Sequence, residues 1–182
     1  EADETVIVDI DSVSGGGATE SGTQQETITI TNDDTAPTLT LTSSASSISE
    51  DAGSSLTLTS TLTNATNADV TVSLSVSGTS TAGSDYTALS NITISAGETT
   101  GTTSFTPIND NTFEGDETAI IDVNSVSGGS ASENGTQQLT ITILEDDAGP
   151  SLSINDVSTS DESAGNATFT LTTEQVFGSN MT

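Results

Sequence analysis

The sequence predicts an all-β chain made of tandem antiparallel β-sandwich domains. Two observations carry this prediction: short runs in which apolar residues alternate with Thr or Ser, and an internal repeat about as long as one sandwich domain. No stretch holds the 3.6-residue period of an amphipathic helix. The fold class therefore rests on residue pattern and repeat length together.

The alternating runs give each predicted strand one apolar face and one hydroxyl face. β-Branched residues dominate these runs, which suits a pleated, half-buried surface. Gly, Asn, Asp and Ser fill the segments between them, as expected of turns. The runs are TITIT (27–31), TLTLT (38–42), LTLT (56–59), VTVSLSV (70–76), ITI (92–94), LTITI (139–143) and FTLT, with Phe169 and Leu171.

The internal repeat divides the chain into one complete and two partial units. Residues 1–37 match residues 114–150 at about two-thirds of positions, and SISEDAG (47–53) answers STSDESAG (158–165). The spacing of about 113 residues is too long for a solenoid coil and suits a sandwich domain. We predict the C-terminal part of a repeat at 1–35, a complete domain at 36–148 and the N-terminal part of the next repeat at 149–182.

The two partial repeats do not add up to a whole one. Joined head to tail, they would lack about 42 residues, which cover three predicted strands. A piece of a longer array of repeats is the simpler interpretation. Neighbouring repeats of the same chain are then the first expected partners.

The charge of the chain excludes several function classes. Among 182 residues there are 27 Asp plus Glu and no Lys, Arg or His, so the formal net charge is −27. Such a chain cannot release counterions from nucleic acid, is repelled by anionic membranes and forms no salt bridges between side chains. It also lacks cysteine and any apolar run long enough to cross a membrane. We therefore expect no nucleic-acid partner and no membrane insertion.

Acidic residues gather in an ordered set of short blocks. These are SEDAG (49–53), TAGSDY (81–86), SAGET (95–99), INDNTFEGDE (108–117) and ILEDDAGP (143–150). Their order resembles the Calx-β domain, a module named from the cytoplasmic regulatory part of the sodium–calcium exchanger and found in large surface and adhesion proteins. The resemblance implies an immunoglobulin-like, seven-stranded sandwich that binds Ca²⁺ at one end, between loops and beside the domain junction.

The resemblance also implies the calcium ligands. Calcium takes six to eight oxygens and favours carboxylates, so acidic loops at one end of a sandwich can supply a site. The ligands implied in the complete domain are Glu50, Asp85, Asp110, Glu114, Glu117, Asp146 and Asp147. Their equivalents in the partial repeats are Glu1, Glu4, Asp33, Asp34 and Glu162. The stretch Asn109-Asp110-Asn111 is less acidic than the exchanger pattern, so we expect fewer or weaker ions.

Each of these residues also has a plainer interpretation. Asp146-Asp147 could form a solvated turn, Asp85 could cap a turn, Asp116 could face solvent, and Tyr86 is expected in the core. INDNTF also resembles the linker motif of cadherins, but here it falls inside the repeat rather than at its boundary. No EF-hand loop is present.

Catalysis is not expected. Without His, Cys or Lys only carboxylates remain for acid–base chemistry, and one Tyr with no Trp gives little to stack on a sugar. The sequence instead predicts a calcium-stabilised structural repeat of a long secreted or cell-surface protein, acting as a stiff extender in an adhesin. The alternative is a repeat subunit of a self-assembling extracellular filament or matrix, whose partners are other copies of the chain. A regulatory calcium sensor is less favoured.

Overall fold

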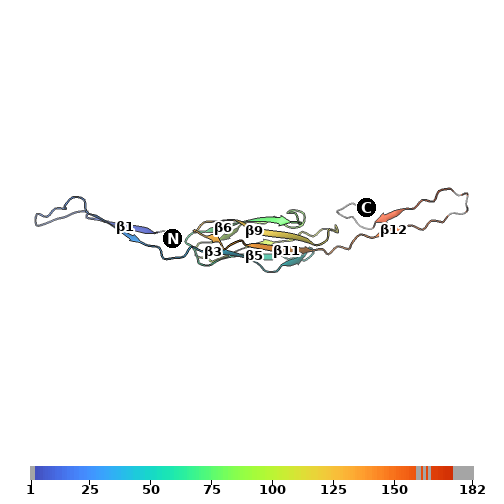
Figure 1. Ribbon diagram of the computed structural model, residues 1–182, viewed down its shortest axis with the longest axis horizontal. Helices are drawn as coiled ribbons and strands as arrows, with labels where there is room; N and C mark the ends of the chain where they lie inside the picture. Colours follow the sequence, from blue (N-terminus) through green and yellow to red (C-terminus); the bar gives the residue numbers. More distant parts are fainter. Residues whose placement is uncertain (1–2, 159–160, 162, 164, 174–182) are drawn as a thin grey trace.

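The computed structural model describes residues 3–158, 161, 163 and 165–173. In that part of the chain the regular elements are 13 β-strands in four sheets. Two of the sheets form a sandwich, and a two-stranded hairpin projects from each of its opposite ends (Figure 1). None of the described residues belongs to a helix that is long and apolar enough to cross a bilayer.

One layer of the sandwich is a four-stranded sheet in the order β10-β3-β5-β8. The strands β3, β5 and β8 pair antiparallel, whereas β10 pairs parallel with β3 at the edge of the sheet. The bounds of these strands are Thr38–Ser43 for β3, Leu56–Leu62 for β5, Thr100–Phe105 for β8 and Ser132–Glu133 for β10.

The other layer is a five-stranded sheet in the order β4-β11-β9-β6-β7. Its strands pair antiparallel except for β4, which lies parallel to β11 at the edge. The bounds are Ser47–Ser49 for β4, Val70–Gly78 for β6, Ile92–Ile94 for β7, Glu117–Ser127 for β9 and Gln138–Leu144 for β11. The short strands β4 and β10 raise the number of strand segments above the seven that the resemblance implied.

The two hairpins come from opposite ends of the described chain. The N-terminal hairpin consists of β1 (Glu4–Asp9) and β2 (Gln25–Ile30), and the C-terminal hairpin consists of β12 (Leu152–Ile154) and β13 (Leu171–Thr173). Both pairs are antiparallel. The chain thus enters the sandwich through β3 at one end and leaves it through β11 at the other (Figure 1).

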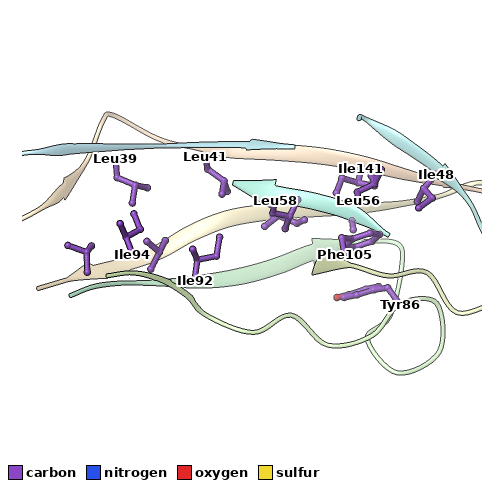
Figure 2. Close-up of a cluster of buried hydrophobic side chains, with 14 of the residues drawn as sticks. Leu39, Leu41, Ile48, Leu56, Leu58, Tyr86, Ile92, Ile94, Phe105 and Ile141 are labelled. Atoms are coloured by element: carbon purple, nitrogen blue, oxygen red, sulfur yellow. The ribbon is translucent and has the colours of Figure 1, made fainter. Parts of the chain in front are cut away.

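Apolar side chains from the two layers fill the space between them (Figure 2). Leu39, Leu58 and Phe105 are fully buried there, and the intervening Thr and Ser residues lie largely on the outer faces. Tyr86 stacks on Phe105, with ring centroids 5.1 Å apart and an interplanar angle of 21°. The expectation that Tyr86 belongs to the core is confirmed, because the side chain is buried.

The all-β prediction is confirmed, and every alternating run contributes to a strand. Alternation did not single out β8, because its sequence is TGTTSF and its inward positions are Gly101, Thr103 and Phe105, of which only Phe105 is a large apolar residue. A side chain there has no room: a Cβ on Gly101 would lie 2.5 Å from the Thr93 carbonyl oxygen and 2.9 Å from the Ile92 Cγ2. The two sheets therefore approach closely at β7 and β8, and the approach requires glycine.

The close approach at Gly101 predicts the effect of a single methyl group. We expect Gly101→Ala to lower the free energy of unfolding by about 1–3 kcal/mol, because backbone atoms must move to admit the Cβ. Urea unfolding measures this change, with Thr102→Ala on the exposed face of the same strand as the control, expected within about 0.5 kcal/mol of the parent. Equal stability of the two variants would contradict the packing described here.

Candidate metal centre

Carboxylates from five parts of the chain meet at the end of the sandwich from which β11 leaves. Strands β4 and β11 end there, and β9, which is antiparallel to β11, begins there. The loops that follow β6 and β8 reach the same end. The acidic residues placed there are Glu50, Asp85, Asp110, Glu114, Asp116, Glu117, Glu145, Asp146 and Asp147. Residues far apart in sequence are thus collected by the topology of the sandwich.

One group of possible ligands consists of Asp85, Glu114 and Glu117. Each offers a carboxylate oxygen, and these three oxygens lie within 4.8 Å of one another. Asp85 is only 8% exposed. Its Oδ2 accepts a hydrogen bond from the Thr81 N–H at 2.5 Å, so it caps a turn as well as facing the other two acids. The turn-capping interpretation is therefore confirmed for Asp85, and its assignment as a calcium ligand stays a prediction.

A second group consists of Glu50, Glu145 and Asp146, again with three carboxylate oxygens within 4.8 Å. Glu50 follows β4 directly, is 8% exposed, and donates its backbone N–H to the Leu144 carbonyl at 3.1 Å. That hydrogen bond continues the parallel pairing of β4 with β11 and fixes the acid beside the exit segment.

Glu145 is the site residue that the sequence did not reveal. Its Oε2 accepts the N–H groups of Glu114 and Gly115 at 2.5 and 2.7 Å. Its Oε1 accepts the N–H groups of Asp146 and Asp147 at 3.1 and 2.9 Å. One carboxylate thus ties the loop before β9 to the segment after β11. The repeat could not point to it, because the equivalent position in the first repeat is Asn32.

Asp116 also links the loop before β9 to the segment after β11, and here the loop supplies the acceptor. Asp116 is exposed, as expected, and its Oδ1 accepts the backbone N–H of Glu145 at 3.0 Å. The N-terminal hairpin repeats this contact, since the Asp3 Oδ1 accepts the Asn32 N–H at 2.8 Å. The same local geometry therefore recurs one repeat earlier, without the Glu145 carboxylate.

Asp110 and Asp147 lie beside the two groups rather than within them. Asp110 caps its own loop, accepting the Thr112 N–H at 2.6 Å, and its charge raises the pKa of Glu50, Glu114 and Asp147. Asp147 has a buried Oδ2 with no hydrogen-bond donor. Burial first, and then the charges of Glu145, Asp146 and Asp110, raise the pKa of Asp147. A buried, unpaired carboxylate oxygen is what a bound cation would satisfy.

Three of the ligands predicted in the partial repeats lie among the described residues, namely Glu4, Asp33 and Asp34. Glu4 begins β1 and is exposed, as are Asp33 and Asp34. The Asp34 N–H donates to the Asn32 Oδ1 at 3.2 Å. Glu1 and Glu162 lie outside the described residues. The ligand assignments in all three repeats stay predictions.

Burial and the repulsion between neighbouring charges raise the pKa of several of these carboxylates. Burial, and then the charges of Glu145, Asp110, Asp146 and Glu114, raise the pKa of Glu50 from an ordinary 4.5 to about 7. Burial, a hydrogen bond with Asp85 and the charges of Asp85, Glu114 and Glu50 raise the pKa of Glu117 to about 7 as well. Burial also raises the pKa of Glu145, but its four backbone hydrogen bonds outweigh this effect and lower it. Glu145 therefore stays ionised near neutral pH, where Glu50 and Glu117 still hold protons.

Comparison with protein families identifies the domain that carries these acids. The family model of the Calx-beta domain matches residues 32–147, which is more than half of the chain. The chain belongs to the Calx-beta family. Calx-beta domains are non-catalytic modules that bind Ca²⁺. The family resemblance read from the acidic blocks is therefore confirmed, and so is calcium as the cofactor.

Solved structures similar to the chain also include Calx domains. The crystal structure of the apo-form Calx CBD1 domain shares 19% identity at a TM-score of 0.49, covering 60% of this chain and 99% of that one. The crystal structure of CBD12 from CALX1.2 shares 20% identity at a TM-score of 0.48, covering 56% of this chain and 42% of that one. A comparison with curated protein sequences found no match.

The donor set fits calcium. Carboxylate oxygens are the ligands that Ca²⁺ prefers, and both groups supply three of them within one coordination sphere. Among the residues described, no Lys, Arg or His competes for these oxygens, because the sequence has none. When bound, the ion supplies the positive charge that neutralises the crowded acids and the multiple contacts that join their loops. Asp85, Glu114 and Glu117 would hold one ion, and Glu50, Glu145 and Asp146 a second.

The raised pKa values predict how stability depends on pH. In calcium-free solution we expect the free energy of unfolding of the sandwich to fall as pH rises from about 5 to about 8. The folded chain holds protons on Glu50 and Glu117 that the unfolded chain has released, so their contribution is present below pH 4.5 and is lost as pH rises through about 7. Urea unfolding with chelator measures the trend, and Glu50→Gln with Glu117→Gln should flatten it. A stability that rises with pH would contradict these pKa directions.

The hydrogen bonds of Glu145 predict a separate effect. In Glu145→Gln one oxygen becomes an NH₂ group, so two of the four backbone N–H groups lose their acceptor. We expect the free energy of unfolding in chelator to fall by about 1–2 kcal/mol, and we expect calcium to bind more weakly. Calorimetric titration with calcium measures the affinity. Glu98→Gln is the matched control, since Glu98 lies in the β7–β8 turn at the other end of the sandwich, and unchanged affinity in both variants would show that Glu145 does not hold the site.

Proposed function

We propose that the chain is a calcium-stabilised structural repeat of a long secreted or cell-surface protein, acting as a stiff extender in an adhesin. The observation that carries the proposal is the position of the acidic site, at the end of the sandwich where β11 passes into the segment toward the C-terminal hairpin (Figure 1). Calx-beta domains occur in extracellular regions of membrane proteins and in adhesins, which supports this setting.

An ion at this position would join the exit segment to the body of the sandwich. Glu145 and Asp146 belong to the exit segment, whereas Glu50 belongs to the turn after β4, so the second group spans both. The Phe113 ring lies beside the same segment, since its ring carbons are 3.8 and 3.9 Å from the position that a Cβ on Gly149 would occupy. Restraining the segment at several points limits how far the next repeat can swing.

The entry segment is restrained at the opposite end. The Asn64 Nδ2 donates to the Thr35 carbonyl at 3.4 Å, and the Thr38 N–H donates to the Thr63 Oγ1 at 3.0 Å. These contacts hold the segment between β2 and β3 against the loop that follows β5. Restraints at both ends support a rod in which the partners of each repeat are its neighbours in the chain.

A self-assembling extracellular filament or matrix is the second candidate. In that setting the partners of each chain are other copies of the chain, which would assemble side by side or end to end. A regulatory calcium sensor fits family membership as well. The sensor requires calcium to change the arrangement of the domain, whereas the extender requires calcium to stabilise one arrangement.

Thermal unfolding tests the extender. We expect saturating calcium to raise the midpoint of the sandwich relative to chelator by roughly 10 °C, since a site filled to about 100 times its dissociation constant adds about 2.7 kcal/mol. Magnesium at the same concentration should raise it much less, because Mg²⁺ requires near-ideal octahedral geometry and gives up its water reluctantly, whereas Ca²⁺ accepts irregular sets of carboxylates. A variant that alters both groups, Asp85→Asn and Glu117→Gln combined with Glu50→Gln and Asp146→Asn, should remove most of the calcium effect. Equal midpoints in calcium and chelator would rule out calcium as the stabilising element.

A further inference from the structure

The four outer strands of the sandwich differ in how well their free edges are protected. In the four-stranded sheet the outer strands are β10 and β8, and in the five-stranded sheet they are β4 and β7. Strand β10 has two residues, and β4 and β7 have three each, whereas β8 has six. Very short outer strands are one device by which proteins keep sheet edges from pairing with other chains. Strand β8 lacks this device.

Strand β8 also lacks the other usual forms of edge protection, which are charge, proline and a bulge. Its sequence, TGTTSF, contains neither proline nor a charged residue, and residues 99–109 carry no charge. Its register with β5 runs without a shift. By contrast, β4 is followed directly by Glu50 and Asp51, and β10 contains Glu133. The edge of β8 is therefore the exception among the four.

The hydrogen bonds of β5 show which backbone groups of β8 remain at the edge. The Leu62 N–H donates to the Thr99 carbonyl at 2.8 Å, one position beyond the paired residues of the two strands. Hydrogen-bonded and non-hydrogen-bonded pairs alternate along an antiparallel ladder, so every second residue of β8 directs its N–H and C=O groups away from β5. These residues, all exposed, are Thr100, Thr102 and Ser104.

The segment between β6 and β7 meets this edge only past the end of β8. There the Thr87 N–H donates to the Thr106 carbonyl at 2.9 Å. The segment then passes to the core side of the strand, since a Cβ on the inward position Gly101 would lie 2.5 Å from the Thr93 carbonyl oxygen. Within the described part of the chain, β5 is the one strand that pairs with β8. Residues 100–104 thus form an open pairing edge.

The uncharged surface continues from this edge across the outer face of the sheet. The outward residues of β3, β5 and β8 are threonine or serine, and none of the three strands contains an acidic residue. In the register Thr59 stands opposite Thr42 on one side and Thr102 on the other. On a chain of net charge −27, a second copy can approach this surface with little repulsion between carboxylates.

We infer that β8 of one chain pairs antiparallel with β8 of a second copy, so that two four-stranded sheets join into one. A contact between identical strands is self-complementary and has a two-fold axis. Centred on Thr102, it places Thr102 opposite Thr102 and Thr100 opposite Ser104, and all of these direct their backbone groups outward. Hydroxyl side chains that stand opposite one another on the outer face add favourable cross-strand pairs.

A second copy fits this edge better than a charged partner does. Strand addition to an open edge gains main-chain hydrogen bonds, while side chains select the partner. Strand β8 offers no charge to recognise, and a copy of itself satisfies its outward N–H and C=O groups in pairs. The strands run along the long axis of the molecule (Figure 1), so paired copies lie side by side in opposite directions. This lateral contact goes beyond the extender role and uses no residue of the acidic site.

Charge on the rest of the molecule sets the conditions in which the contact forms. Each chain carries a formal charge of −27, so two copies repel each other at low ionic strength. Salt shortens the range of that repulsion to about 8 Å at physiological strength. Association should therefore strengthen with sodium chloride, which is the opposite of an interface held by ion pairs.

Sedimentation of the 182-residue chain in calcium and high salt tests the inference. We expect a dimer whose fraction rises with protein concentration. Thr102→Pro removes an outward N–H at the centre of the contact and leaves the ladder with β5 intact, as outer strands allow. Thr102→Asp instead places two carboxylates opposite each other. Both variants should stay monomeric, and Thr102→Asp should keep the thermal midpoint of the parent.

Thr57→Asp is the matched control, because it adds the same charge to the same face, on the inner strand β5. It should leave association unchanged. Loss of the dimer in Thr57→Asp would indicate packing between faces and overturn pairing at the edge. A parent chain that stays monomeric at every concentration, or a Thr102→Asp variant that associates like the parent, would also overturn it. The calcium effect on unfolding is a separate measurement, so failure of the extender leaves this result unaffected.

Single cysteines report the register of the contact, because the chain has none of its own. In a hydrogen-bonded antiparallel pair the Cα atoms lie about 5.5 Å apart. This separation falls within the range of about 4.4–6.8 Å in which disulfides form. With oxidised glutathione as the oxidant, Thr102→Cys should yield a covalent dimer much faster than Thr57→Cys. Equal rates for the two variants would contradict a contact centred on Thr102.

Discussion

Carboxylate charge without any cationic side chain is the constraint on which the rest of this molecule depends. With no Lys, Arg or His, each acid that leaves bulk water must be met by a backbone N–H group, a proton or an ion from solution. Glu145 takes the first course with four N–H groups, and Glu50 and Glu117 hold protons near neutral pH. The calcium chemistry of the family follows from the same shortage, because the ion is the cation that the chain lacks.

The front half of the sandwich (β3 to β5) and its back half (β9 to β11) each contribute one edge strand to the sheet of the other, and this holds the two halves together. The edge strand β4 crosses to the sheet of the back half, and β10 crosses to the sheet of the front half. Their apolar faces meet in one core, while Thr and Ser keep the outer faces in water. This arrangement lets a modest apolar content support a folded domain, and it places the ends of β4 and β11 and the start of β9 together, where the acids converge.

Much of this could be predicted from the sequence, and the exceptions have physical reasons. Period-two runs found seven of the 13 described strands, because each of these has an apolar and a hydroxyl face. The strands outside the runs are β1, β4, β8, β9, β10 and β12, and in β8 the reason is that Gly101 occupies an inward position. The acidic blocks led to Asp85, Glu114, Glu117, Glu50 and Asp146, which the fold gathers into two groups. Glu145 could not be found, since its role lies in hydrogen bonds to backbone that only the folded loops bring within reach. Asn32, at the equivalent position of the first repeat, hid it further.

The parallel pairing of β4 with β11 has a mechanical consequence. Tension along the rod would enter through β3 and leave through β11, so it would draw β4 and β11 in opposite directions along their common axis. Hydrogen bonds such as those from the Thr142 N–H to Ser46 and from the Glu50 N–H to Leu144 run across that axis, at 2.9 and 3.1 Å. They would share a shearing load and give way together, whereas a hairpin pulled open at one end loses its bonds one after another.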